Sequence, residues 1–272
     1  MKKNTGKRFK NSKIGNFFRW KFELKKIRKF SLNYFFSILG NKNYVPFIIL
    51  TRSRTGSNLL VDYLNSHAQI FVRSEIFRHL HGRKYQAVLQ RVYRKQPRFI
   101  KAVGFKIFYR HPFDAPDSGL WNFLEQDRAI RVIHLTRNNI LRSIVSHRIA
   151  DKIDIWFQKR KTNPAKISAA EKKIRLDFNE LQAEFAQTVQ WQLEGRERFR
   201  EHPVLNITYE ELVRDPESAF AEICGFLGVP YRNPASAFMK QNPENLQDLI
   251  GNYAELRDGF RGSRWEVFFE EK

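Results

Sequence analysis

Short apolar runs alternate with segments of helical periodicity along most of the chain. Continuous apolar runs that end at polar residues are typical of buried parallel strands, whereas apolar residues three and four positions apart are typical of helices. The pattern predicts strands over 45–54, 69–72, 101–109, 129–137 and 204–212, and helices over 57–67, 138–157, 168–200 and 216–229. This alternation predicts an α/β fold, a single domain with a central, mostly parallel sheet flanked by helices.

Positive charge is unevenly distributed along the chain, which has a formal net charge of +21. Residues 1–43 contain thirteen lysines and arginines and one acid, Glu23, with aromatic residues such as Phe17 and Trp20 between them. We therefore expect a basic, aromatic N-terminal extension over 1–43 and a folded domain over 44–272. Such an extension lies on an anionic membrane surface or is simply solvated, and binding along a nucleic acid is the less favoured alternative.

Length and composition exclude several classes of protein. The 272 residues, of which 42% are hydrophobic, suffice for one α/β domain with a buried core, and no apolar run approaches the roughly 20 residues of a membrane span. The single cysteine, Cys224, excludes an intrachain disulfide framework and a cysteine-rich zinc site. We expect a cytoplasmic protein without a metal, in peripheral contact with the inner membrane surface through residues 1–43.

The segment TRSRTGSNLL (51–60) joins the first predicted strand to the first predicted helix. Gly56 allows the backbone to turn and approach a ligand, and the helix N-terminus offers free N–H groups to an anion. Ser57 and Asn58 are candidate caps of that helix. Arg52 and Arg54 add positive charge. The GxxxxGK[ST] motif of nucleotide triphosphatases is absent, so the segment predicts a different phosphate loop, with an ordinary turn as the alternative.

Four segments, in the same order along the chain, resemble motifs of sulfotransferases that use 3′-phosphoadenosine-5′-phosphosulfate (PAPS). TRSRTGSNLL is similar to their 5′-phosphosulfate loop, and RVIHLTRNNILRSIVSH (131–147) to their 3′-phosphate motif. The other two are VLNITYEELVRDPESAFAEICGFLGVPY (204–231) and NYAELRDGFRGSRWEVFFEE (252–271), which resembles the segment that closes over the nucleotide. The resemblance fits bacterial members that modify carbohydrates, including trehalose and Nod-factor sulfotransferases, and implies a P-loop-like sulfotransferase fold.

The resemblance implies that PAPS is the sulfuryl donor and leaves as 3′-phosphoadenosine-5′-phosphate (PAP). Arg54 would contact the 5′-phosphosulfate, and its role would be electrostatic because arginine stays charged. Arg52 would assist it or face solvent. The backbone amides of four residues would contact the same group: Thr55, Gly56, Ser57 and Asn58.

Binding of the rest of the donor is assigned through the same resemblance. Arg137, at the end of a predicted strand, would grip the 3′-phosphate. Ser146 is its favoured partner and Ser143 the rival. Tyr209 matches a tyrosine that contacts adenine. Three residues fall in the segment that closes over the nucleotide, where the pattern RDGFRGSRW departs from the family: Arg257, Arg261 and Gly262.

An acceptor hydroxyl needs a base that removes its proton. The resemblance places Glu75 of the segment SEIF (74–77) in this role, and His79, expected one helical turn later, is the alternative. Lys106 would stabilise the transferring sulfonate or extend to solvent. His134 lies inside an apolar strand and is expected to be a satisfied core residue.

The function that follows is transfer of a sulfuryl group from PAPS to a hydroxyl of a carbohydrate or glycolipid acceptor. Acceptor selectivity is expected in the segments 78–97, 111–127 and 149–173, and the long helix predicted over 168–200 is a candidate homodimer interface. A nucleic-acid-binding protein with incidental phosphate loops and a small-molecule kinase with a degenerate P-loop are the alternatives. No nucleic-acid module and no Walker lysine supports them.

Overall fold

The computed structural model of the chain describes residues 40–154, 168–235 and 244–270. Of the described residues, 40–42 and 94–98 belong to one unit of the chain, and all the others belong to a second unit. In the first unit, Asn41 and Gln96 form an antiparallel bridge with backbone hydrogen bonds of 3.0 and 2.8 Å. Nearly all of the predicted extension over 1–43 lies outside the described residues, so its boundary and its membrane contact stay predictions.

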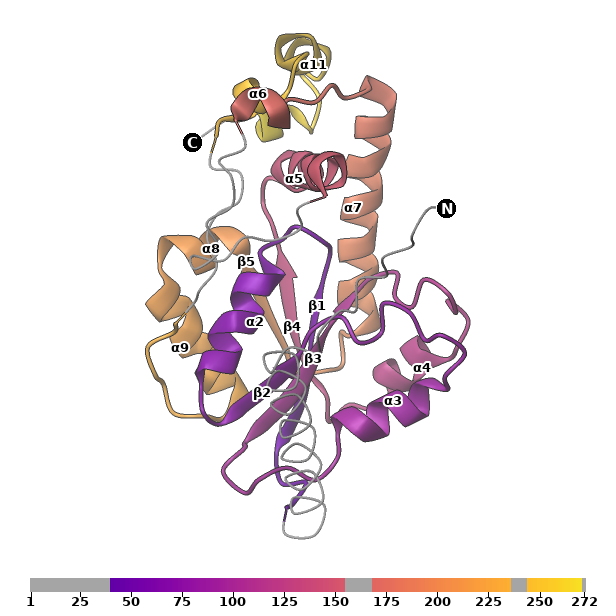
Figure 1. Ribbon diagram of the computed structural model, residues 1–272, viewed down its shortest axis with the longest axis vertical. Helices are drawn as coiled ribbons and strands as arrows, with labels where there is room; N and C mark the ends of the chain where they lie inside the picture. The colour runs from indigo at the N-terminus through magenta and orange to yellow at the C-terminus, as the bar shows by residue number, and fades with distance from the viewer. Residues whose placement is uncertain (1–39, 155–167, 236–243, 271–272) are drawn as a thin grey trace, which may run out of the picture. The chain divides into compact units, whose positions relative to one another are not determined.

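A five-stranded parallel sheet forms the centre of the second unit (Figure 1). Its order is β2-β3-β1-β4-β5, and every neighbouring pair is parallel. The strands are β1 (Val45–Thr51), β2 (Ile70–Arg73), β3 (Ala102–Phe108), β4 (Arg131–Thr136) and β5 (Val204–Thr208). This arrangement confirms the predicted fold class, and it brings the loops after β1 and β4 together at the carboxyl edge of the sheet.

Helices cover both faces of the sheet because successive residues of each strand point to opposite sides. Phe47 and Ile49 of β1 pack with α2 (Ser57–Ser66), α8 (Tyr209–Arg214) and α9 (Pro216–Leu227). Ile48 and Leu50 pack in a second cluster with α3 (Tyr85–Val92) and α4 (Leu120–Gln126). Neither α3 nor α4 was predicted, and both lie in segments expected to select the acceptor.

A third apolar cluster lies beyond the sheet and joins helices from the second half of the chain. Its rings include Phe185, Phe260 and Trp265, all buried. The elements that contribute are α5 (Ile140–Ile153), α7 (Phe178–Arg198), α10 (Leu246–Leu249), α11 (Tyr253–Gly259) and the 3₁₀ turn η1 (Glu266–Phe269). The C-terminal segment is therefore part of the core next to α5.

The prediction of one continuous helix over 168–200 is wrong. The helix is interrupted between α6 (Ala169–Lys172) and α7, where Ile174 donates its N–H to Leu249 O at 2.8 Å and accepts from Gly251 N at 2.7 Å. Asp177 then starts α7 as its N-cap, accepting from Glu180 N at 2.9 Å. The backbone hydrogen bonds of Ile174 and the N-cap at Asp177 therefore interrupt the helix, although the apolar residues keep helical spacing across the break. A dimer contact through this region stays a prediction.

The strand predicted over 204–212 ends earlier, at Thr208, and α8 follows at once. The Thr208 hydroxyl accepts from Glu211 N at 3.2 Å, and the Glu211 carboxylate accepts from Thr208 N at 2.7 Å. This capping box converts the second half of the segment to helix. As a consequence, Tyr209 lies at the first turn of a helix at the carboxyl edge of the sheet.

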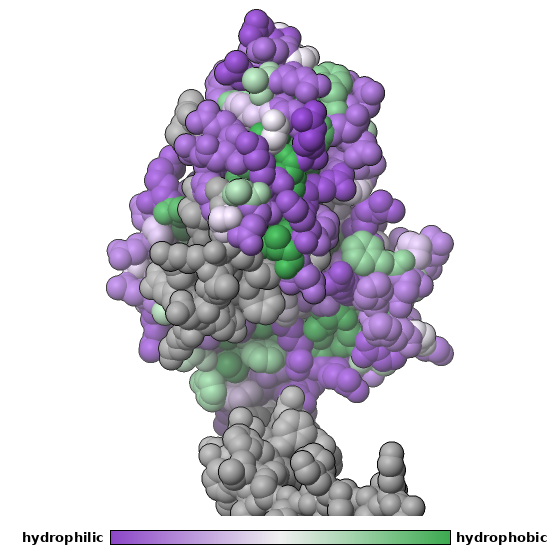
Figure 2. Space-filling model, turned by 45° about the horizontal axis from the view of Figure 1, so that its top comes forward, coloured by the Kyte–Doolittle hydropathy of each residue, from purple (hydrophilic) through white to green (hydrophobic). Residues whose placement is uncertain are grey.

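The surface agrees with a protein whose apolar residues are mostly buried. The face shown in Figure 2 is largely hydrophilic, and its hydrophobic residues lie in separate groups. Of the helices in the described part of the chain, none has the length and hydrophobicity needed to span a bilayer. Cys224 is a buried free thiol.

Candidate active site

The loop between β1 and α2 has a fixed conformation at the carboxyl end of the central strand. The Thr51 hydroxyl bonds to Leu135 O of β4 at 2.7 Å and to the Thr55 hydroxyl at 2.6 Å. Arg54 and Gly56 both have positive φ angles, of 65° and 78°. These contacts hold the turn against two strands and aim the N-terminus of α2 at the sheet edge, where an anion can bind.

Gly56 is required by close packing as well as by its backbone angle. A Cβ atom there would lie 2.3 Å from the Tyr209 ring. The Tyr209 ring of α8 therefore lies directly against the loop between β1 and α2. This places the predicted adenine contact next to the predicted 5′-phosphosulfate loop.

The predicted capping of α2 by Ser57 or Asn58 is wrong. The N-cap is Gly56, and no side-chain capping hydrogen bond forms there in the described part of the chain. The Ser57 hydroxyl and the Asn58 amide oxygen instead accept from Lys106 Nζ, at 3.3 and 2.6 Å. The amides of the first helical turn have no intrahelical partner, as in any α-helix. Because the Ser57 and Asn58 side chains bind the lysine and do not cap these amides, the amides are available to a ligand.

Lys106 points inward from β3 and does not extend to solvent. Its side chain is 1% exposed, and Nζ lies 2.9 Å from Glu75 Oε1. Burial lowers the pKa of the Lys106 ammonium below its ordinary value, and the Glu75 carboxylate partly offsets this effect. The structure thus brings two predicted catalytic residues into contact beside the N-terminus of α2.

Glu75 lies in a turn after β2 and not in the expected helix. Arg78 N donates to Glu75 O at 3.2 Å, and the helical pattern goes no further. His79 therefore does not share a helix face with Glu75; its ring lies 5.7 Å from that of Phe113 and 5.5 Å from that of His81. Glu75 therefore contacts Lys106. Among the described residues, no contact between His79 and Lys106 is found.

Arg54 and Arg137 meet at the junction of the two loops. The carbonyl oxygen of Arg54 accepts from Arg137 Nη1 at 3.1 Å and from the Ser143 hydroxyl at 3.3 Å. Arg54 Nε donates to the Ser146 hydroxyl at 2.9 Å. Both candidate serines thus lie in this cluster, and the choice between them as partner of the 3′-phosphate stays open.

The cluster concentrates positive charge that is largely removed from water. Burial, with the nearby charge of Arg137, lowers the pKa of Arg54 to about 10, so Arg54 remains protonated at neutral pH. The Arg137 guanidinium carbon lies 4.5 Å from the centre of the Tyr209 ring. Arg137 Nε is buried without a hydrogen-bond acceptor among the described residues, and Glu210 Oε1 is 3.9 Å away. A buried donor without an acceptor fits a phosphate ligand.

Arg52 faces α7, so the alternative that it faces solvent is wrong. Its side chain is 14% exposed and donates to Glu184 Oε2 at 3.1 Å and to the Thr188 hydroxyl. Its predicted contact with the donor stays a prediction. The sequence offered no sign of Glu184, because a glutamate on a long helix is ordinarily solvated.

The residues of the predicted closing segment lie on and after α11. Arg257 and Arg261 approach Asp258 Oδ1 at 3.5 and 2.7 Å and are exposed. Gly262 N donates to Glu266 Oε2 at 2.8 Å. Their contact with a nucleotide stays a prediction.

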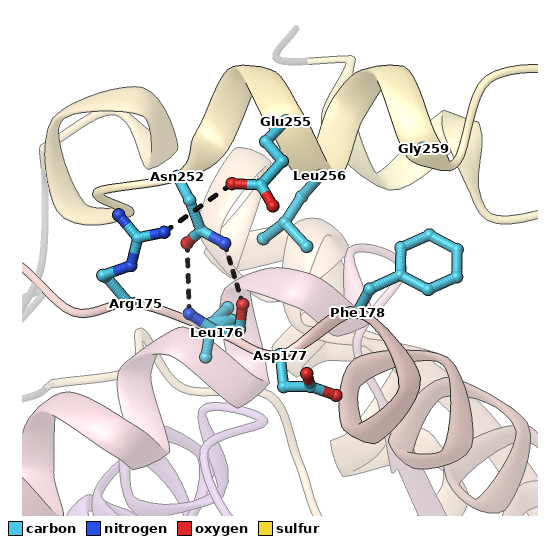
Figure 3. Close-up of a pocket in the computed structure, with 8 residues that line it drawn as sticks. All are labelled: Arg175, Leu176, Asp177, Phe178, Asn252, Glu255, Leu256 and Gly259. Atoms are coloured by element: carbon cyan, nitrogen blue, oxygen red, sulfur yellow. Dashed lines mark hydrogen bonds and ion pairs between the residues drawn. The ribbon is translucent and has the colours of Figure 1, made fainter.

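A pocket of about 660 Å³ lies beside α11 (Figure 3). Asn252 closes one side through two hydrogen bonds to the backbone of Leu176, 3.2 and 2.9 Å long. Phe178 lines the other side, and Arg175 and Glu255 face each other across the opening. None of the predicted donor-binding residues lines this pocket.

His111 is a buried residue of the site region that no pattern in the sequence indicated. It is 1% exposed, and its Nδ1 accepts from Phe108 N at 3.3 Å. Its Nε2 is buried and has no hydrogen-bond partner in the described chain. Burial lowers the pKa of His111 to about 4, with Glu75 partly offsetting the shift, so the ring is neutral. The available signal was a histidine shortly after the strand that carries Lys106.

His134 is the satisfied core residue that was expected. Its Nε2 bonds to the Tyr109 hydroxyl at 2.7 Å and its Nδ1 to Asn206 Oδ1 at 3.2 Å. Burial lowers its pKa to about 4. In the described chain, no group of three or more His, Cys, Asp or Glu side chains could hold a metal ion.

Acid should destabilise the fold through these two neutral histidines. Below about pH 6.5 the unfolded chain binds protons that the folded state binds only near pH 4, so the free energy of unfolding falls as the pH decreases between these values. Each histidine should contribute about 2 kcal/mol between pH 7 and pH 5. Urea unfolding of the wild type and His134→Asn at both pH values measures this. The wild type should lose about 2 kcal/mol more than the variant; equal losses would contradict the assignment.

Comparison with known proteins gives related sequences along most of the chain. A model of the sulfotransferase family matches residues 128–233. Nodulation protein H of Rhizobium tropici is 28% identical over 250 residues, which cover 83% of this chain and 93% of that protein. Nodulation protein H of Rhizobium meliloti (strain 1021) is 25% identical over 244 residues, covering 83% and 95%.

Among solved structures, a sulfotransferase from Alicyclobacillus acidocaldarius is 17% identical, covers 83% of this chain and 96% of its own, and superposes with a TM-score of 0.48. A mouse sulfotransferase complexed with PAP is 15% identical, covers 85% and 76%, and has a TM-score of 0.40.

The segment matched by the family model contains much of the cluster described above. It includes β4, β5 and the cluster residues Arg137, Ser143, Ser146 and Tyr209. The relatives extend the similarity over most of the rest of the chain. The chain is therefore similar to sulfotransferases: the family model covers residues 128–233, and the two nodulation proteins extend the similarity over most of its length.

Proposed function

We propose that this protein is a sulfotransferase that moves a sulfuryl group from PAPS to a hydroxyl of a carbohydrate or glycolipid. The contact between Lys106 and Glu75 carries the proposal. It places a buried cation and a carboxylate together at the N-terminus of α2, where the phosphate loop presents its amides. Such a pairing supplies charge stabilisation and a proton acceptor at one point.

The donor would be held by both loops at the sheet edge. The amides of residues 55–58 and the Arg54 guanidinium would bind the 5′-phosphosulfate. Arg137 would bind the 3′-phosphate together with Ser146 or Ser143, and its buried Nε supports this assignment. Tyr209 would contact the adenine, while Arg257, Arg261 and Gly262 would cover the nucleotide.

The reaction would proceed by in-line transfer. The acceptor oxygen forms a bond to sulfur as the bond between sulfur and the bridging phosphate oxygen breaks, and PAP leaves with the electron pair. Glu75 takes the proton of the acceptor hydroxyl. Lys106 and Arg54 stabilise the negative charge that develops on the sulfonate and on the bridging oxygen.

Incubation of the full chain with PAPS labelled in the sulfonate and with a panel of oligosaccharides and glycolipids tests this function. Calorimetry with PAP measures donor binding without any acceptor. We expect PAP binding and transfer of label to at least one hydroxyl acceptor. Absence of PAP binding would contradict the proposal, and tight duplex DNA binding without PAP affinity would favour the nucleic-acid alternative.

A further inference from the structure

A second pocket, of about 300 Å³, lies between β2 and α3. Three arginines line it, with apolar side chains between them. The lining residues are Arg73, Ile76, Arg83, Ala87, Val88, Arg91 and Val92. No carboxylate is among them, so the pocket, as far as the described chain forms it, combines an apolar floor with positive charge.

Arg83 is held in place before any ligand arrives. The turn that carries it is fixed by Asp114, whose carboxylate accepts from Leu80 N at 2.8 Å and His81 N at 2.7 Å. Arg83 Nε donates back to Leu80 O at 2.9 Å. A guanidinium with its orientation already set loses less entropy when it binds an anion.

The other two cations come from different elements. Arg73 ends β2, with its guanidinium carbon 5.2 Å from the centre of the Phe71 ring, and Arg91 lies in the last turn of α3. Neither Arg83 nor Arg91 has a carboxylate within ion-pair distance among the described residues. Like charges gathered around one cavity attract an anion strongly.

The pocket is continuous in sequence with the candidate active site. Arg73, Glu75 and Ile76 lie in one short segment, and Arg73 pairs with Phe105, the residue before Lys106. Because alternate residues of a strand face opposite sides, Lys106 points toward α2 whereas the pocket opens toward α3. A molecule that reaches both places must extend around the end of β2.

We propose that this pocket binds a carboxylate or phosphate group of the acceptor while another part of the same acceptor presents its hydroxyl to Glu75. The proposal rests on the sulfotransferase function above. It makes the acceptor an anionic saccharide of more than one unit, since the two positions lie on opposite sides of the sheet edge. The apolar floor from Ile76, Val88 and Val92 would contact a sugar face.

The test uses the full chain with PAP bound and three probes: cellobiouronic acid, its neutral methyl ester, and cellobiose phosphate. Calorimetry should show that each anion binds about 10-fold or more tightly than the ester. The double variant Arg83→Gln/Arg91→Gln should lose this preference. Arg200→Gln, which removes an exposed arginine at the end of α7 that pairs with Glu197, should keep it.

Equal affinity of the wild type for acid, phosphate and ester would overturn the proposal, as would an unchanged preference in the double variant. Binding to phosphatidylglycerol vesicles that the double variant loses, without a saccharide preference, would assign the pocket to lipid headgroups and also overturn it. The affinity for PAP is measured separately. If the wild type does not bind PAP, the sulfotransferase function itself is contradicted. If the double variant still binds PAP, its loss of anion preference concerns the acceptor alone.

Discussion

Replacing Glu75 by glutamine should lower the turnover number about 10²- to 10⁴-fold and leave PAP affinity close to that of the wild type. Glutamine keeps the shape of the side chain and can still accept a hydrogen bond from Lys106 Nζ, which lies 2.9 Å from the carboxylate. It cannot take the proton of the acceptor hydroxyl. Steady-state transfer of labelled sulfonate gives the turnover number, and calorimetry gives the PAP affinity.

The matched control is His79→Gln, since His79 is the alternative base from the same segment. Its ring contacts His81 and Phe113, so we expect turnover within a few-fold of the wild type. If Glu75→Gln retained normal turnover and His79→Gln lost it, the roles would be reversed. Thermal unfolding of both variants shows whether Lys106, which is 1% exposed, tolerates loss of the charge beside it.

Arg137→Ala should weaken PAP binding by roughly 30-fold to several thousand-fold, because truncating one partner of a buried charged pair costs about 2–5 kcal/mol. Arg137 is 11% exposed, and its Nε has no acceptor among the described residues. A phosphate would provide that acceptor. The dissociation constant of PAP, measured by calorimetry at fixed ionic strength, gives the effect.

Two further variants separate a phosphate contact from a structural effect. Arg137→Lys keeps the charge but loses the two-pronged geometry, so its affinity should fall between those of the wild type and Arg137→Ala. Arg131→Gln changes an arginine at the opposite end of β4, where its guanidinium bonds to Phe226 O, and should leave PAP affinity unchanged. Similar losses in Arg131→Gln and Arg137→Ala would indicate a general loss of folding instead.

The five strands could be predicted because a strand buried on both faces is a continuous apolar run, which the pattern of hydrophobicity shows directly. The interruption of the helix between Lys172 and Phe178 could not be predicted, because it depends on backbone hydrogen bonds from Ile174 to Leu249 and from Gly251 to Ile174. The start of α8 was recognisable in principle from Thr208 and Glu211, three positions apart, as a capping box.

The candidate site was predictable where it lies in one loop and less so where it depends on contacts between distant segments. In the segment from Thr51 to Asn58, the sequence pattern directly predicts the end of a strand, a turn and the start of a helix. The inward position of Lys106 and its contact with Glu75 depend on how β2, β3 and α2 come together, which no spacing in the sequence reveals. His111 required knowledge of burial, because a histidine before a proline is otherwise an ordinary loop residue.

The carbonyl oxygen of Arg54 accepts from both Arg137 and Ser143, so the loop after β1 meets the loop after β4 and the first turns of α5 at one backbone atom. The backbone position of Arg54 therefore depends on that of Arg137, 83 residues later in the chain. Over evolutionary time, insertions or exchanges in one loop should survive only alongside matching changes in the other. A variant that carries only the first loop of a distant relative should therefore fold poorly, whereas a variant that carries both loops should fold. The two loops should accordingly change together in evolution.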